Sequence, residues 1–172
     1  MELTLFYRGA LKTNGDAAHK HDIRRVFAPQ IRRRIPILAA HQIIHRVEGE
    51  ASLSFCAPIT RANGRTAELS ITLLRPSAPG EIIQHGGDID NRLKTLFDAL
   101  RCPTIPEVPP AARAEIQQIA NPLGLFCCLM EDDALVSSLA IRTDRLLDVD
   151  PAEKPNEVVL IIHVRAATHV AI

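Results

Sequence analysis

The chain has 172 residues, of which 47% are apolar and 23% are charged, and its formal net charge is zero. This length and composition exclude a disordered or fibrous chain, because one core of ordinary size can be buried. No stretch approaches the roughly 18 consecutive apolar residues of a membrane span, and the N-terminal MELTLFYRGALK lacks a secretory cleavage site. We expect one domain over residues 1–172 and no membrane partner.

The first predicted elements are a strand and a helical segment. Glu2–Arg8 alternates apolar with polar residues, which is the period of a half-buried strand. Over residues 17–40 the spacing changes to four, as in a helix, and the spaced residues are Ile23, Phe27, Ile31 and Ile35. Pro29 and Pro36 interrupt this pattern, so we expect two short helices or one kinked helix.

The charged face of this helical segment is basic, with Arg24, Arg25, Arg32, Arg33 and Arg34. Residues 8–34 hold eight basic residues against two acids, and residues 131–157 hold eight acids against three basic residues. Only the local field acts on a phosphate, so the zero net charge does not exclude a nucleic-acid partner. An ordinary solvated helix face is the alternative interpretation.

Two further strands are predicted at Ser52–Pro58 and Ala67–Arg75, with Asn63-Gly64 as the turn of a hairpin between them. A loop rich in Pro and Gly follows, and then a helix from Asp88 to about Arg101, whose apolar stripe is Ile89, Leu93, Leu96, Phe97 and Leu100.

Residues 102–124 contain five prolines and one helical candidate, Ala111–Ala120, and are interpreted as an insertion. The apolar run Leu125–Met130 precedes the last two predicted strands, Leu135–Leu147 and Glu157–Ala166. Strands and helices do not alternate strictly. The predicted class is therefore α+β, with a small mixed sheet flanked by helices.

The four cysteines are Cys56, Cys102, Cys127 and Cys128, and none of them forms a CxxC motif. This pattern indicates a reduced, cytoplasmic protein rather than a disulfide framework. A zinc site built from cysteines and histidines remains a weaker alternative.

The segment GGDIDNRLKTLFDAL, residues 86–100, contains the candidate chemistry. It brings Asp88 and Asp90 to the first turn of the predicted helix, and Lys94 lies one turn after Asp90 on the same face. Carboxylates beside a lysine suit metal-assisted phosphodiester cleavage, because Mg²⁺ prefers oxygen ligands and activates a bound water. The alternatives are helix capping for the acids and an ordinary surface ion pair for Asp90 and Lys94.

A second acidic segment, Glu131-Asp132-Asp133, lies between the apolar run and the next predicted strand. Acids at a strand edge can reach a site formed by the preceding helix. A third carboxylate would allow the site to hold two cations about 4 Å apart. The alternative is a solvated turn with two aspartates as its turn residues.

Together these residues resemble the RusA-type Holliday-junction resolvases. The resemblance lies in the Asp-x-Asp-Asn-x-x-Lys pattern of residues 88–94, the Phe-Asp-Ala-Leu at 97–100 and the Asp-Asp-Ala-x-Val at 132–136. It implies an α+β fold, a homodimer with one site per subunit and magnesium-dependent strand cleavage. Carried over by position, the catalytic residues are Asp88, Asp90, Lys94 and Asp133, and the metal ligands are Asp88, Asp90 and Asp133.

The expected function is therefore a magnesium-dependent endonuclease, with Mn²⁺ as a possible substitute, that acts on Holliday junctions or other branched DNA in recombination and repair. The cell would be prokaryotic or phage-infected.

Expected DNA contacts are Asn91, Arg24, Arg25, Arg32, Arg33 and Arg34. Two differences from the family are a longer gap before Asp132 and the sequence GALKTNG at residues 9–15 where the family has a Pro- and Asn-rich motif. The alternative is a nucleic-acid-binding module of the same fold that does not cleave.

Overall fold

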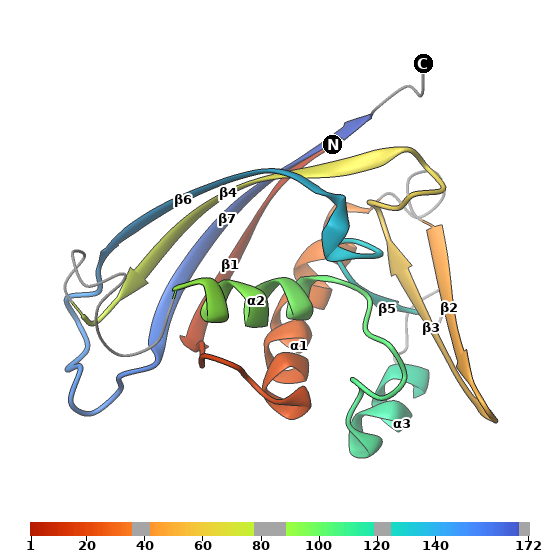
Figure 1. Ribbon diagram of the computed structural model, residues 1–172, viewed down its shortest axis with the longest axis horizontal. Coiled ribbons are helices and arrows are strands. Elements are labelled where there is room, and N and C mark those ends of the chain that lie inside the picture. The colour runs from red at the N-terminus through yellow and green to blue at the C-terminus, as the bar shows by residue number, and fades with distance from the viewer. Residues whose placement is uncertain (36–41, 78–88, 119–124, 169–172) are drawn as a thin grey trace.

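The computed structural model describes residues 1–35, 42–77, 89–118 and 125–168, which form two mixed sheets and three α-helices (Figure 1). The four-stranded sheet has the order β1 (Glu2–Ala10), β7 (Glu157–Thr168), β4 (Arg65–Arg75), β6 (Val136–Arg145). The three-stranded sheet has the order β2 (Gln42–Glu48), β3 (Ala51–Ala57), β5 (Phe126–Cys127). The helices are α1 (Ala17–Arg34), α2 (Ile89–Leu100), α3 (Pro110–Gln118) and the short 3-10 helix η2 (Asp133–Leu135). The α+β class is confirmed, although two sheets form where one was expected.

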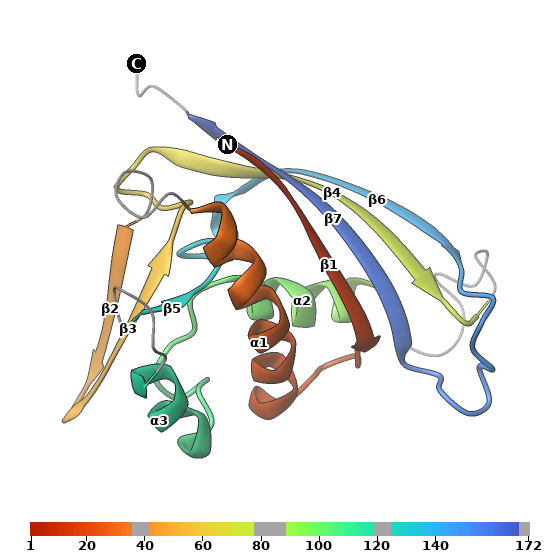
Figure 2. The same cartoon turned by 180° about the vertical axis from the view of Figure 1, so that it is seen from behind.

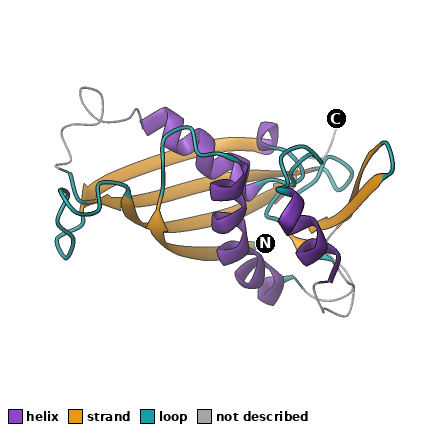
Figure 3. Cartoon of the chain, turned by 90° about the horizontal axis from the view of Figure 1, so that it is seen from below, coloured by secondary structure: helices purple, strands orange, loops and turns teal. Residues whose placement is uncertain are grey.

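The main core lies between the four-stranded sheet and the helices α1 and α2, which cover one of its faces (Figure 3). Alternate residues of β1 point into this core, so that Leu3, Leu5 and Tyr7 are buried. The predicted strands at the two ends of the chain are confirmed: β1 pairs antiparallel with β7, and β7 pairs antiparallel with β4.

The helical segment after β1 is one continuous helix, α1, with Pro29 inside it. Asp16 caps its N-terminus by accepting a hydrogen bond from the His19 N–H at 2.8 Å. Pro29 is exposed, so the carbonyl one turn before it can be solvated after losing its N–H partner. Of the two predicted alternatives, two short helices or one kinked helix, the structure has a single helix over residues 17–34. Pro36 and the remainder of the predicted segment, to residue 40, lie outside the described residues.

The predicted hairpin between β3 and β4 is wrong, although its turn is present. The Gly64 N–H donates to the Arg61 carbonyl at 3.0 Å, and Gly64 has φ +62°. However, the two strands leave this turn into different sheets, because β3 pairs with β2 and β5. The hairpin instead joins β2, which was not predicted, to β3 through Gly49 and Glu50. Gly49 has φ +58°, which suits the first position of a two-residue hairpin loop.

The segment interpreted as an insertion contributes to a second core. Its buried residues pack with the three-stranded sheet, and they are Cys102, Ile105, Val108, Ala112 and Ile116. The predicted helix within the segment corresponds to α3. Residues 102–118 are thus an integral part of the fold, and residues 119–124 lie outside the described residues. No helix in the described part of the chain is long and apolar enough to cross a membrane.

An ionic network joins α1 and α2 to this segment. Asp98 of α2 accepts from Lys20 of α1 at 2.8 Å and from Arg101 at 3.0 Å. Arg101 also donates to Glu107 at 2.5 Å, and the Thr104 N–H donates to the same carboxylate at 2.8 Å. Burial raises the pKa of Glu107, but the hydrogen bonds from Arg101 and Thr104 outweigh it and lower this pKa to about 2.

Glu107→Gln tests this network, because it removes the charge and keeps the shape. The pKa of Glu107 is lower in the folded state than the ordinary 4.5, so its stabilisation is present above about pH 4.5 and is lost as the pH falls toward 2. We expect the variant to be about 1–2 kcal/mol less stable at pH 7 in urea unfolding, with a smaller difference at pH 3. Glu153→Gln, at an exposed position, is the control. Equal stability of wild type and Glu107→Gln at pH 7 would contradict this account.

Candidate active site

The first turns of α2 present two charged side chains to solvent. Asp90 and Lys94 are exposed, and Asn91 between them is half-buried. None of the ion pairs among the described residues includes Asp90 or Lys94. The predicted surface pair between these two residues is therefore absent from this part of the chain, and both groups are available to a ligand. Asp88 lies outside the described residues.

The opposite face of α2 is fixed by burial. Leu93, Leu96 and Leu100 are buried in the main core, and Ile89 and Phe97 pack against it, which confirms the predicted apolar stripe. This burial leaves the helix only one rotational setting. It therefore determines which residues of the motif face solvent.

Two polar contacts anchor α2 to the segment that follows β1. Arg92 is 7% exposed and donates to the Leu11 carbonyl and, at 3.1 Å, to Asn156 Oδ1. The hydroxyl of Thr95 accepts from the N–H of Gly15 at 3.0 Å. A Cβ on Gly15 would lie 2.8 Å from Thr95 Cγ2, so this approach requires glycine. Neither contact is predictable from local sequence patterns, because each joins residues about 80 positions apart.

The acidic turn around η2 is held by its own hydrogen bonds and by arginines. Asp132 caps η2 by accepting from the Ala134 N–H at 2.9 Å, and its carboxylate lies 3.8 Å from Arg61. The hydrogen bond from Ala134, with help from Asp133 and Arg61, lowers the pKa of Asp132. Asp133 is exposed and has no ion pair with the described residues. Of these two acids, Asp133 is therefore the freer one.

Asp90 lies in the first turn of α2, whereas η2, which contains Asp133, follows a segment that pairs beside the C-terminal end of this helix. The N–H of Leu129 donates to the carbonyl of Leu100 at 2.9 Å, so the segment leading to η2 is attached to the C-terminal end of the helix. The ten residues from Asp90 to Leu100 span about 15 Å at 1.5 Å per residue. Within the described residues, no group of three or more His, Cys, Asp or Glu side chains is arranged to hold a metal ion.

The basic residues of α1 divide into three groups. Arg24 is 2% exposed and donates to the carbonyl of Asp98 at 2.7 Å, so its assignment to the exposed charged face is wrong. It packs on the apolar side of α1, between α1 and α2. Arg25 is exposed but paired with Glu115 at 2.8 Å. The remaining arginines of α1, Arg32, Arg33 and Arg34 in its last turn, are exposed and have no ion pair with a described residue.

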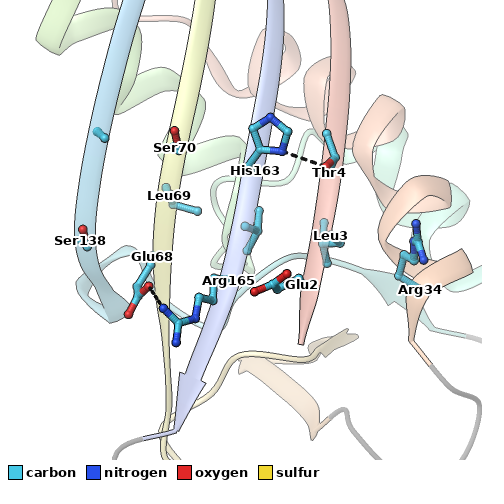
Figure 4. Close-up of a pocket in the computed structure, with 12 residues that line it drawn as sticks. Glu2, Leu3, Thr4, Arg34, Glu68, Leu69, Ser70, Ser138, His163 and Arg165 are labelled. Atoms are coloured by element: carbon cyan, nitrogen blue, oxygen red, sulfur yellow. Dashed lines mark hydrogen bonds and ion pairs between the residues drawn. The ribbon is translucent and has the colours of Figure 1, made fainter.

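A polar hollow of about 500 Å³ lies on the four-stranded sheet, with Arg34 at its side (Figure 4). Its side chains are largely paired with each other: Thr4 hydrogen-bonds to His163 at 3.0 Å, and Arg165 contacts Glu68 at 3.3 Å. These residues come from the solvent-facing positions of the strands, and α2 contributes none of them. The hollow is therefore separate from the candidate residues on α2.

Thr95→Val should loosen the attachment of α2, because it leaves the buried N–H of Gly15 without an acceptor. We expect a loss of about 1–3 kcal/mol in the free energy of unfolding. Thr4→Val is a matched control, since the hydroxyl of Thr4 bonds at an exposed site where water can replace it. If the two variants unfold at the same denaturant concentration, the Gly15–Thr95 contact does not contribute to anchoring the helix.

Comparisons with models of protein families, with curated proteins and with solved structures find no match to this chain. The features that bear on function are therefore the acidic motif at the start of α2, the acidic turn at η2 and the exposed arginines at the end of α1.

Proposed function

We propose that the protein is a magnesium-dependent endonuclease that cuts branched DNA, with Holliday junctions as its expected substrate. The observation that carries this proposal is that one set of α2 side chains holds the helix in the fold, while two charged side chains are left exposed. Every apolar residue of α2 packs in the core, and Arg92 and Thr95 anchor the helix. Asp90 and Lys94 are exposed and have no ion pair with a described residue. Exposed charges without partners at the start of an anchored helix are suited to binding a ligand.

In the proposed mechanism, Asp88 and Asp90 would hold Mg²⁺, for which Mn²⁺ could substitute. The metal would supply a coordinated water of lowered pKa and positive charge near the scissile phosphate. Lys94 lies one turn after Asp90 and would stabilise negative charge that develops on the phosphate oxygens.

Asp133 is the proposed third metal ligand. Its exposure supports this choice over Asp132, whose carboxylate is already engaged by the Ala134 N–H. A site with all three acids requires Asp133 to approach the N-terminal end of α2 from the position that it occupies near the C-terminal end. Carboxylates that lie close together repel one another, and a bound cation would offset this repulsion.

Asn91 and the exposed arginines of α1 are the proposed DNA contacts. Arg32, Arg33 and Arg34 have no ion pairs with described residues and can neutralise phosphates. Arg25 would have to leave Glu115 to do so. The proposed protein is a homodimer, because symmetrical cuts across a junction need two sites. The four free cysteines suit the reducing cytoplasm of a prokaryotic or phage-infected cell.

The second candidate function is that of a binding module, which binds branched DNA without cutting it. The separation of Asp133 from Asp90 favours this alternative, because two distant carboxylates do not form one metal site. Metal dependence distinguishes the two functions. Only the nuclease needs magnesium for its effect on DNA.

Asp90→Asn tests the metal site, because it keeps the shape of the side chain and removes one ligand charge. We expect cleavage of a labelled four-way junction to fall to background, and binding without metal to stay equal or tighten as a repulsive charge is lost. Magnesium should raise the melting temperature of the wild type and raise that of the variant less. Asp98→Asn is not a suitable control, since Asp98 lies in the ionic network. Asp150→Asn, in an exposed turn, is suitable.

The same junction-cleavage assay distinguishes the roles of the other proposed catalytic residues. Lys94→Ala should reduce cleavage strongly and leave the stabilisation by magnesium intact. Asp133→Asn should abolish cleavage, and wild-type cleavage by this variant would make Asp132 the next candidate. If Asp88, Asp90 and Asp133 can each be neutralised without loss of cleavage, the proposed site is wrong.

The DNA contacts are tested by a triple replacement of Arg32, Arg33 and Arg34 with Ala. We expect weaker DNA binding and a smaller slope of log affinity against log salt, lower by about one unit for each lost phosphate contact. Replacing Arg8, Lys12 and Lys154 with Ala changes the net charge equally and should leave the slope unchanged. An equal slope in the Arg32–Arg34 variant and the wild type would mean that these arginines are only a solvated surface.

A further inference from the structure

β6 is an edge strand without a second neighbour among the described strands. It pairs with β4 over residues 136–145, and its other edge pairs with no described strand. All ten residues of β6 are half-buried or exposed. The other edge strand of this sheet, β1, has α1 beside it (Figure 2). The side chain of Gln30 from α1 bonds to both the N–H and the carbonyl of Phe6, at 2.9 and 2.7 Å, and so occupies backbone groups of this edge. A long uncovered edge offers a row of backbone groups to another strand.

The sequence of β6 is electrostatically self-complementary. Arg142 and Asp144 point to the same face of the sheet, opposite Thr72 and Leu74 of β4. Neither has an ion pair within the described part of the chain, and the Asp144 carboxylate accepts only from the N–H of Arg145. In an antiparallel pair of identical strands with a two-fold axis at Thr143, Arg142 lies directly opposite Asp144 of the other copy, on both sides of the axis. Directly opposite residues share a face, so two ion pairs form.

The same two-fold axis would place two exposed apolar residues, one from each copy, opposite each other. Leu139 is 42% exposed and Leu147 is 85% exposed, and each lies four residues from Thr143. Leu139 is in register with Leu69 of β4, which points into the main core, so its exposed side continues the core face of the sheet. Pairing along β4 continues beyond β6, because the Leu146 N–H donates to the Arg75 carbonyl at 2.7 Å. Leu147 lies in the turn that follows β6, so an antiparallel partner would bring this turn toward Leu139 of the other copy.

We propose that two copies of the chain associate through β6, antiparallel about a two-fold axis at Thr143, so that the two four-stranded sheets form one continuous sheet. Backbone hydrogen bonds along the edge, two Arg142–Asp144 ion pairs and two Leu139–Leu147 contacts hold the copies together. A two-fold interface uses the same patch on both copies, which is what a self-complementary strand supplies. This interface would be that of the homodimer in the proposed function. The observations that support it concern β6 alone and do not depend on DNA cleavage.

Charge reversal tests the ion pairs by sedimentation velocity at micromolar concentration. The wild type should sediment as a dimer. Arg142→Asp alone and Asp144→Arg alone each place like charges opposite one another twice, and should weaken association by about tenfold or more. The double variant restores both pairs with reversed sign and should recover the wild-type dimer. Arg165→Asp, on β7 at the same face but away from the edge, is the control and should not change the association.

A cysteine at the axis tests the register. Thr143→Cys brings two thiols together and should give a disulfide-linked dimer under a mild disulfide oxidant such as oxidised glutathione. Leu139→Cys should not, because two copies of position 139 lie about 26 Å apart, eight residues at about 3.3 Å each. The native cysteines are all buried and do not compete. Circular dichroism would establish that each variant is folded.

A monomeric wild type, a double variant that stays monomeric, or cross-linking through Leu139→Cys but not Thr143→Cys would each overturn this interface. None of these results bears on the metal site. Junction cleavage by the same samples reports on the proposed function separately, so that failure of one proposal can be told from failure of the other.

Discussion

The burial of one face of α2 is the constraint on which the candidate site depends. Leu93, Leu96 and Leu100 fill the space under the four-stranded sheet, and they leave the helix one orientation. Arg92 and the contact between Thr95 and Gly15 then fix its position along the sheet. Asp90 and Lys94 are exposed because the packing of the opposite face requires it. In this way apolar packing, which is nondirectional, determines where two charges point.

The charged side chains that form ion pairs or hydrogen bonds within the fold are a different set from the exposed ones at the candidate site. Arg24, Lys20, Asp98, Arg101 and Glu107 are engaged in contacts between α1, α2 and the segment before α3. Removing one of these groups would leave a buried or half-buried partner uncompensated, which costs stability. Asp90, Lys94 and Asp133 have no ion pair with a described residue, and Asp133 contacts only the neighbouring carboxylate of Asp132 among the described side chains. This contrast supports a stabilising role for the first group and a ligand-binding role for the second.

The local sequence was sufficient to predict β1, α2, β6 and β7, and in β1, α2 and β7 the burial follows a repeat of two or of three to four residues. Pairing between distant segments was not predictable. The turn at Gly64 is real, but it separates two sheets, and nothing near it in the sequence indicates that β3 pairs with β2 and β5. The error at Arg24 was avoidable, since this residue lies three, four and seven positions before the buried Phe27, Ala28 and Ile31 and so shares their face of α1.

For the candidate site, sequence spacing placed Asp90 and Lys94 on the same open face of α2, but it could not give the distance to Asp133, which depends on how the chain returns after α3. The central claim is that this face binds magnesium and cleaves DNA. The most direct test incubates the purified protein with labelled four-way junctions, flaps and linear duplex, with and without magnesium. The account predicts cuts in branched DNA only when magnesium is present. Binding of junctions with no cut in any substrate would contradict it and would favour the binding module.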